Sequence, residues 1–162
     1  MSMFRMGVGY DVHRLVSERP LILGGIEIPF HQGLAGHSDA DVLSHALGDA
    51  LLGAVGLGDL GRLFPDSDPR YKGISSLRLL ERIIFLIHQK GYRVGNVDST
   101  VVAQEPKLAP HVQKMQTVLA PVLQVPADQI SIKATTSEGL GFAGRQEGIA
   151  AYAVVLLVKA DT

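Results

Sequence analysis

The sequence contains no cysteine among its 162 residues. This absence excludes disulfide bonds, thiolate metal ligands and cysteine nucleophiles, so any metal ion must be bound by His, Asp or Glu. The chain also lacks an excess of positive charge, since 15 Lys and Arg face 16 Asp and Glu. We therefore expect neither nucleic-acid binding nor attraction to an anionic membrane surface.

Long apolar runs are absent as well. The longest, residues 149–158, is too short to cross a bilayer as a helix. Residues 1–6 lack the charged, apolar and small-residue regions of a signal peptide. These features together predict a protein that works in the cytoplasm, without a membrane partner.

The composition is apolar for a small protein. Hydrophobic residues make up 46% and charged residues 19% of the chain, and the mean hydropathy is +0.21. A chain of this length fits one domain, expected over residues 1–162, and can bury roughly 70% of its unfolded surface. Because so apolar a monomer would expose apolar surface, we expect partner subunits to cover part of it.

Two short segments carry the strongest chemical signal. In the β-prone segment 9–13, Asp11 and His13 are two residues apart, so on a strand both side chains point to the same face. Further on, Ser38 and Asp41 have the spacing of a capping box. That box predicts a helix over about Asp39–Val55, with His45 on its polar side at the seam with the core.

One carboxylate and two imidazoles that met there would supply three metal ligands and leave a tetrahedral cation one open position. That pattern is typical of a catalytic zinc site. The residues alone also fit a simpler interpretation, in which Asp11 and His13 form a surface pair and His45 is a hydrogen-bonded boundary residue. Both interpretations stay open on this evidence.

The rest of the chain alternates strand and helix patterns. It predicts an α+β fold with a mixed β-sheet covered by helices on one side. Its expected elements are a strand over 4–12, a hairpin of strands 21–23 and 26–28 around Gly24-Gly25, a loop over 31–36, helices over 75–89 and 111–123, and strands over 92–104, 130–135 and 149–159. The last strand is almost wholly apolar, which predicts burial on both faces.

Three further stretches are candidate binding loops. Residues 56–73 lose apolar periodicity and carry several aspartates that could accept hydrogen bonds from sugar hydroxyls, although a solvated acidic turn fits as well. Residues 105–110 contain two prolines, so their backbone could read the edge of a planar group or could simply connect a strand to a helix. Residues 133–148 combine hydroxyls, glycines and Glu138, which suits phosphate and a hard divalent cation.

These segments resemble one known family, the 2-C-methyl-D-erythritol 2,4-cyclodiphosphate synthases of the non-mevalonate isoprenoid pathway. The resemblance covers essentially the whole chain, and in this order and spacing its motifs are highly specific. They read G-Y-D-V-H, H-S-D-A-D-V-x-x-H-A-L, G-D-L-G-x-L-F-P-D-S-D-P, G-N-V-D, Q-E-P-K, K-A-T-T-S-E and G-F-A-G-R-Q-E-G-I-A.

The resemblance implies a reaction and a set of roles. The 2-phosphate of 4-diphosphocytidyl-methylerythritol 2-phosphate would attack the β-phosphorus and expel CMP, which leaves a cyclic diphosphate. Asp11, His13 and His45 would bind one Zn²⁺ per subunit, and Glu138 a second cation, Mg²⁺ or Mn²⁺. His37 and Thr136 would stabilise the transition state. The implied substrate-binding residues are Asp11, His13, His37, Ser38, Asp59, Gly61, Phe64, Asp66, Asp68, Ala103, Pro106, Lys107, Ala109, Thr135, Thr136, Glu138, Phe142 and Arg145.

The resemblance also implies an assembly, a homotrimer with active sites between subunits. Phe142 and Arg145 would line an axial cavity that can hold an isoprenoid diphosphate. Two other functions compete with the synthase. One is a zinc-dependent hydrolase of nucleotide diphosphates, in which water attacks instead of the 2-phosphate. The other is a trimeric protein that binds isoprenoid or nucleotide and catalyses nothing.

Overall fold

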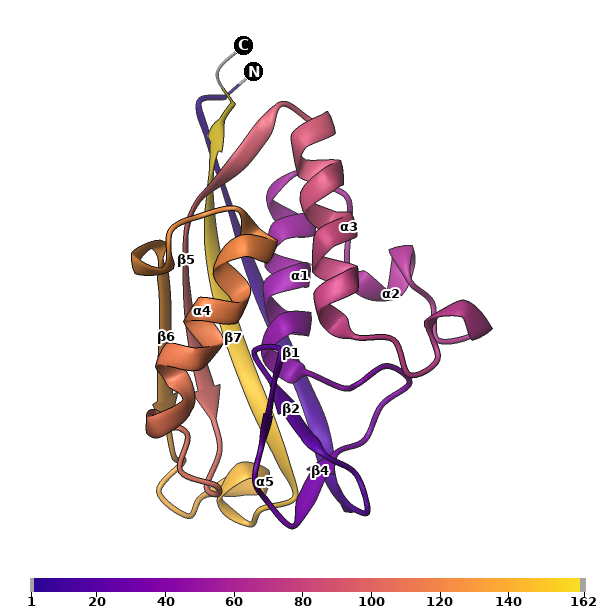
Figure 1. The fold of residues 1–162 in the computed structure, drawn as a ribbon, viewed down its shortest axis with the longest axis vertical. Coiled ribbons are helices and arrows are strands. Elements are labelled where there is room, and N and C mark those ends of the chain that lie inside the picture. The colour runs from indigo at the N-terminus through magenta and orange to yellow at the C-terminus, as the bar shows by residue number, and fades with distance from the viewer. Residues whose placement is uncertain (1, 161–162) are drawn as a thin grey trace.

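A computed structural model describes residues 2–160 of the chain. Its centre is a five-stranded sheet in the order β4-β1-β7-β5-β6 (Figure 1). Only the β5–β6 pair is parallel, so the sheet is mixed, as the sequence predicts. The strands are β1 (Phe4–Ser17), β4 (Gln32–Leu34), β5 (Tyr92–Val102), β6 (Ile130–Thr135) and β7 (Gly148–Lys159), and a separate hairpin pairs β2 (Leu21–Leu23) with β3 (Ile26–Ile28).

Three longer helices cover one face of the sheet. In Figure 1, α1 lies in front of β1 and β7, α3 lies beside α1, and α4 lies against β6. The helices are α1 (Val42–Ala54), α2 (Leu60–Leu63), α3 (Ser76–Gln89), α4 (Val112–Leu123) and α5 (Gly141–Gly144), with 3₁₀ turns at Pro69–Tyr71, Ala109–His111 and Ala127–Gln129. Within residues 2–160 no helix combines the length and the hydropathy needed to cross a membrane.

The fit of α1 onto β1 depends on two glycines. A Cβ atom at Gly7 would overlap the carbonyl oxygen of Ala50, and one at Gly9 would overlap that of Ala46. The sequence pattern predicts such a close backbone approach in this strand. Because α1 lies this close, its residue His45 reaches the side chains that β1 carries next to Gly9.

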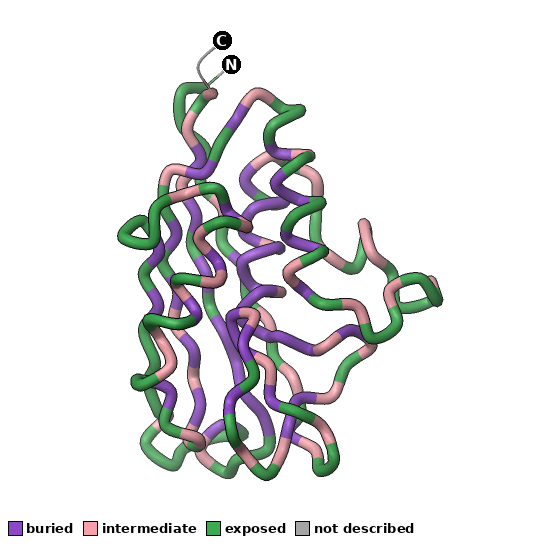
Figure 2. Tube along the Cα trace, viewed as in Figure 1, coloured by how far each residue is buried: buried purple, intermediate pink, exposed green. Residues whose placement is uncertain are grey.

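The opposite face of the sheet is left without helices and is rich in apolar side chains. Figure 2 shows exposed and buried residues alternating along the strands. The exposed apolar residues of β1 and β7 are Phe4, Met6, Val8, Tyr10, Val12, Tyr152 and Val154. The prediction that β7 is buried on both faces is therefore wrong for the single chain, since Tyr152 is 50% and Val154 48% exposed.

Several expected boundaries also change. The first long helix begins at Val42 rather than Asp39, because Asp41 itself is the N-cap and accepts the Ser44 N–H. Residues 32–34, expected in a loop, form the short edge strand β4 beside β1. The long loop over 56–73 contains α2 and a 3₁₀ turn, so it has more local structure than its sequence predicts.

Candidate metal centre and substrate pockets

Three side chains from β1 and α1 meet at one point. Asp11 Oδ2 lies 2.8 Å from His13 Nε2 and 3.2 Å from His45 Nδ1. The two ring nitrogens are 3.3 Å apart, and all three residues are partly buried. The same three atoms thus form a compact triangle, and the sequence prediction that Asp11, His13 and His45 converge is confirmed.

Neighbouring groups orient both rings toward that point. His13 Nδ1 lies 2.6 Å from the Ala35 carbonyl oxygen, which can only accept, so this nitrogen carries the hydrogen and Nε2 keeps a lone pair. Ser38 Oγ lies 3.0 Å from His45 Nε2 and accepts the Ala40 N–H. Its second lone pair can accept from Nε2, which leaves a lone pair on His45 Nδ1 that could bind a metal ion.

A cation fits this arrangement. Asp11 Oδ2 is a buried oxygen without a hydrogen-bond donor when both rings are neutral, so three lone pairs face one another there. A tetrahedral zinc with bonds of about 2.0–2.2 Å would hold its ligand atoms about 3.3–3.5 Å apart. Two of the observed separations, 3.2 and 3.3 Å, are close to that spacing, and the third, 2.8 Å, is about half an ångström shorter.

The same contacts shift the protonation of the triad when it holds no cation. Burial opposes ionisation of Asp11, but the two histidines outweigh it and lower its pKa to about 2. Burial disfavours the charged form of His13, but Asp11 outweighs it and raises the pKa of that imidazole. A proton on His13 can thus take the place of a metal cation beside the carboxylate.

The loop that precedes α1 is held in place from several sides. Arg19 donates to the carbonyl oxygens of Gly36 and Ser38 at 2.9 and 3.0 Å, on either side of His37. The ring of His37 approaches the Asp68 carbonyl oxygen at 3.3 Å. These contacts place His37 and Ser38 at the edge of the candidate metal site.

Asp41 is not part of the triad, and its carboxylate instead connects α1 to the turn between β2 and β3. Its Oδ1 accepts the Gly24 and Ser44 N–H groups, and its Oδ2 accepts the Gly25 N–H and the Ser44 hydroxyl. The carboxylate is fully buried, and burial raises its pKa. Asp41 therefore fixes the start of α1 against the β2–β3 turn.

A cavity of about 340 Å³, here called the metal pocket, opens beside the triad. Its wall opposite α1 comes from the segment around α2. Of the predicted site residues it brings together Asp11, His13, His37, Ser38, His45, Asp59, Gly61, Phe64 and Asp66. Sequence reasoning did not assign a site role to Gly36, Asp49, Leu60, Tyr71 and Leu79, which also line it.

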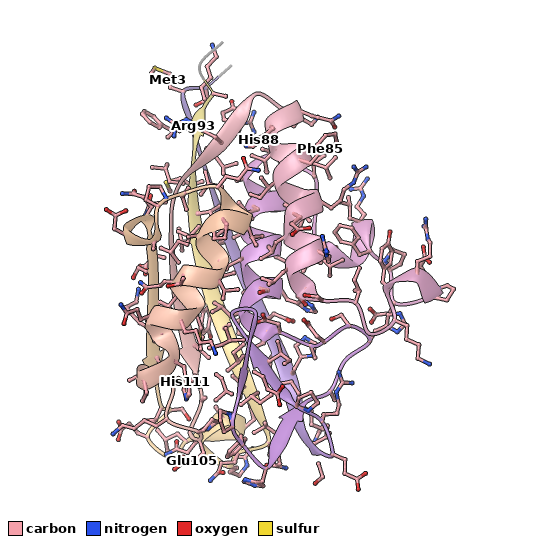
Figure 3. The ribbon with its side chains drawn as sticks, viewed as in Figure 1. Met3, Phe85, His88, Arg93, Glu105 and His111 are labelled. Carbon is pink, nitrogen blue, oxygen red and sulfur yellow. The ribbon has the colours of Figure 1, made fainter. Side chains whose placement is uncertain are left out.

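A second cavity of about 540 Å³, here called the loop pocket, lies between the 103–109 loop and the end of β6. Figure 3 shows Glu105 of this loop at the end of the molecule opposite Met3. The predicted site residues that line the loop pocket are Ala103, Pro106, Lys107, Ala109, Thr135 and Thr136. The two pockets share no lining residue.

Four predicted residues line neither pocket. The carboxylate of Asp68 pairs with Arg70. Glu138 is exposed, and its Oε1 lies 3.5 Å from Thr136 Oγ1 at the rim of the loop pocket. Phe142 is exposed on α5, and Arg145 pairs with Glu147 at the surface.

The chain is similar to known proteins over almost its whole length. A model of the YgbB family matches residues 4–158. The chain is 62% identical to a protein of Syntrophomonas wolfei named 2-C-methyl-D-erythritol 2,4-cyclodiphosphate synthase. The alignment spans 156 residues and covers 96% of this chain and 99% of that protein.

Solved structures show the same fold. The bifunctional IspDF of Campylobacter jejuni matches with a TM-score of 0.94 and 44% identity over 98% of this chain, which spans only 43% of that longer protein. IspF of Plasmodium falciparum, solved as a CDP complex, matches with a TM-score of 0.87 and 35% identity over 99% of both chains.

Proposed function

The chain belongs to the YgbB family, and on that premise we propose that it is an enzyme of isoprenoid biosynthesis that forms 2-C-methyl-D-erythritol 2,4-cyclodiphosphate. Its substrate is 4-diphosphocytidyl-2-C-methyl-D-erythritol 2-phosphate. A 2-phosphate oxygen forms a bond to the β-phosphorus, the bond from that phosphorus to the oxygen of the CMP group breaks, and CMP leaves with the electron pair. The observation that carries this proposal is the Asp11–His13–His45 triangle beside a pocket of substrate size.

The triad is proposed to bind one zinc ion per subunit. Two imidazoles and one carboxylate suit zinc, and three protein ligands leave a position for a substrate oxygen. Bound there, the cation would neutralise part of the diphosphate charge. Phosphoryl transfer requires little covalent help from protein groups, so positioning and charge neutralisation supply most of the catalysis.

Side chains around the metal pocket are proposed to orient the reacting phosphates. His37 and Ser38 lie next to the triad at the N-terminal approach to α1, where they can donate to phosphate oxygens. The aspartates Asp59 and Asp66 on the opposite wall can accept hydrogen bonds from the ribose and methylerythritol hydroxyls. Gly61 leaves room for the sugar, and Phe64 covers one side of it.

The loop pocket is proposed to hold the cytosine. Its lining contains several backbone groups of the 103–109 loop, which can read the donor and acceptor edge of a planar base. The CDP complex of the Plasmodium falciparum relative supports a cytidine nucleotide as ligand. Thr136 is proposed to stabilise the transition state, and Glu138 to bind a second divalent cation, Mg²⁺ or Mn²⁺, near the phosphates.

A homotrimer is the proposed assembly, with each active site formed between two copies of the chain. Two observations support it: the metal pocket and the loop pocket share no residue, and the helix-free face of the sheet exposes apolar side chains. Burial of that face against other copies would remove apolar surface from water. Phe142 and Arg145 are proposed to line an axial cavity that holds an isoprenoid diphosphate.

The cytoplasm is the proposed location. The substrate carries several phosphate charges and a cytidine nucleotide, so it stays in the compartment where it is made. Fractionation of the producing cells, followed by detection of the chain, tests this placement.

The decisive experiment is phosphorus NMR of the purified protein with the cytidyl diphosphate substrate, Zn²⁺ and Mg²⁺. A cyclic diphosphate with one equivalent of CMP is the expected result. Linear phosphates with CMP would instead establish the hydrolase. Unchanged substrate with a metal-loaded trimer would establish a binding protein.

A further inference from the structure

Asp49 lies on α1, one turn after the metal ligand His45, and contacts the opposite wall of the metal pocket. Its Oδ1 accepts the backbone N–H of Leu60 at 2.8 Å. The side chain is partly buried and lines the cavity. One helix therefore carries both a ligand of the metal site and a contact to the segment that faces it.

The Leu60 N–H is the first amide of the short helix α2. The first four N–H groups of a helix have no acceptor within that helix. Asp59, the N-cap of α2, accepts the Arg62 N–H at 2.9 Å, so the Leu60 amide depends on an acceptor from outside. Asp49 supplies this acceptor from another element.

A packing contact accompanies the hydrogen bond. The Cδ atoms of Leu60 lie 3.2 Å from the place that a Cβ atom would occupy at Gly48. The side chain of Leu60 thus rests on α1 where that helix has no side chain of its own. The hydrogen bond and this contact are formed by neighbouring residues, 48 and 49, with the same residue of α2.

We propose that Asp49 is a positioning residue that holds α2 against α1, so that the substrate-binding residues Asp59 and Gly61 stay in place opposite the metal site. The inference rests on the proposed function for the identity of the substrate. In this role Asp49 acts through Leu60 rather than through a contact of its own with the substrate or the metal.

The role requires an acceptor oxygen rather than a charge. Burial raises the pKa of the Asp49 carboxyl, the Leu60 amide opposes that shift, and the neighbouring charges of Asp11 and Asp59 add to it. An asparagine keeps one acceptor oxygen without the charge. Asp49→Asn should therefore preserve the contact, whereas Asp49→Ala removes it.

Amide hydrogen exchange of the metal-loaded protein without substrate tests the contact directly. In Asp49→Ala the amides of residues 60–64 should exchange about five- to tenfold faster, the factor expected for one lost hydrogen bond. Asp49→Asn and the control Asp128→Ala, an exposed aspartate that lines neither pocket, should keep the wild-type rate. Unchanged exchange in Asp49→Ala would overturn the proposal.

Kinetics and metal content separate positioning from other roles. Asp49→Ala should raise KM for the cytidyl substrate about five- to tenfold, lower kcat less, and keep one zinc per subunit, and Asp49→Asn should restore KM. An Asn variant as impaired as the Ala variant would mean that the charge itself contacts substrate, and loss of zinc would mean a role at the metal. Either result overturns the proposal.

If the wild-type protein formed no cyclic product, the proposed function would fail while the exchange experiment still decided the role of Asp49.

Discussion

His13 and His45 bring two ring nitrogens to within 3.3 Å of each other, although the residues are 32 positions apart and belong to a strand and a helix. With both rings neutral, the facing atoms Nε2 and Nδ1 each present a lone pair. Those lone pairs repel each other, so the approach favours either a cation bound between the rings and Asp11 or a proton on His13. The glycines that let α1 lie close to β1 therefore help to form the candidate metal site.

His45→Ala should abolish stoichiometric zinc binding and nearly all turnover, because two protein ligands rarely retain zinc against competing chelators. Elemental analysis after dialysis against a weak chelator measures the metal content. His88→Ala is the matched control, since His88 is exposed at the end of α3. An unchanged zinc content in His45→Ala would refute the ligand role.

The stability of the metal-free protein should depend on pH through the Asp11–His13 pair. The pKa of His13 is raised, so its contribution is fully present below its ordinary pKa of about 6.5 and is lost as pH rises through the folded-state value. The pKa of Asp11 is lowered to about 2, so its contribution is present above its ordinary value and is lost as the pH falls toward 2.

Urea unfolding of the chelator-treated protein at pH 5.5 and pH 8.5 measures this effect. In the wild type we expect the free energy of unfolding to be lower at pH 8.5 than at pH 5.5. His13→Ala should reduce that difference. Adding zinc should reverse the trend, because the metal competes with the proton on the ligands and binds more tightly as pH rises. The same pH difference in His13→Ala and wild type would contradict the assignment.

Much of the fold follows from local sequence patterns. Strand β6 begins and ends where its pattern predicts, the β2–β3 hairpin forms around Gly24-Gly25, and α3 begins one residue after the predicted start. The metal triad could be predicted because two short motifs fix which side chains share a face. In each case the decisive information lies within a few residues.

The differences come from contacts between distant segments. Asp41 caps α1, and its carboxylate is also held by the Gly24 and Gly25 amides of the β2–β3 turn. The capping-box pattern contains no information about that distant turn. A strand such as β7 has the same apolar pattern whether helices cover both faces or another subunit covers one. The role of Asp49 depends on an amide 11 residues away, although its spacing from His45 is visible in the sequence.

Asp41→Asn should lower the free energy of unfolding by about 2 kcal/mol without removing a metal ligand. The amide nitrogen of asparagine would face either the Gly25 N–H or the Gly24 and Ser44 N–H groups, and none of these can become an acceptor. Urea unfolding measures the loss, with the exposed Asp128→Asn as control. An unchanged midpoint would show that the buried carboxylate does not stabilise the junction of α1 with the β2–β3 turn.

Glu138→Ala should keep zinc but require far more Mg²⁺ or Mn²⁺ for turnover. Glu138 is exposed beside Thr136 and outside the triad, so its loss leaves the three proposed zinc ligands intact. Titration of activity against Mg²⁺ at fixed zinc measures the requirement, and Glu147→Ala tests the effect of removing a nearby exposed carboxylate. An unaltered metal dependence in Glu138→Ala would exclude the second-cation role.

Val8→Lys should convert the proposed trimer into monomers. Val8 is 72% exposed on the helix-free face and pairs across the sheet with Val154. A lysine there would place a charge where other copies are proposed to bury apolar surface, which is costly without a partner charge. Gln113→Lys adds the same charge on the outer surface of α4 and should leave the assembly unchanged.

Three measurements on Val8→Lys test the proposed assembly: sedimentation velocity, zinc content and turnover. The Val8→Lys monomer should retain zinc, because Asp11, His13 and His45 all come from one chain. It should lose turnover, because the metal pocket and the loop pocket share no residue and are proposed to meet only across a subunit boundary. A monomer with full activity would mean that one chain holds the whole substrate. A Val8→Lys protein that remained trimeric would place the subunit contacts away from this face of the sheet.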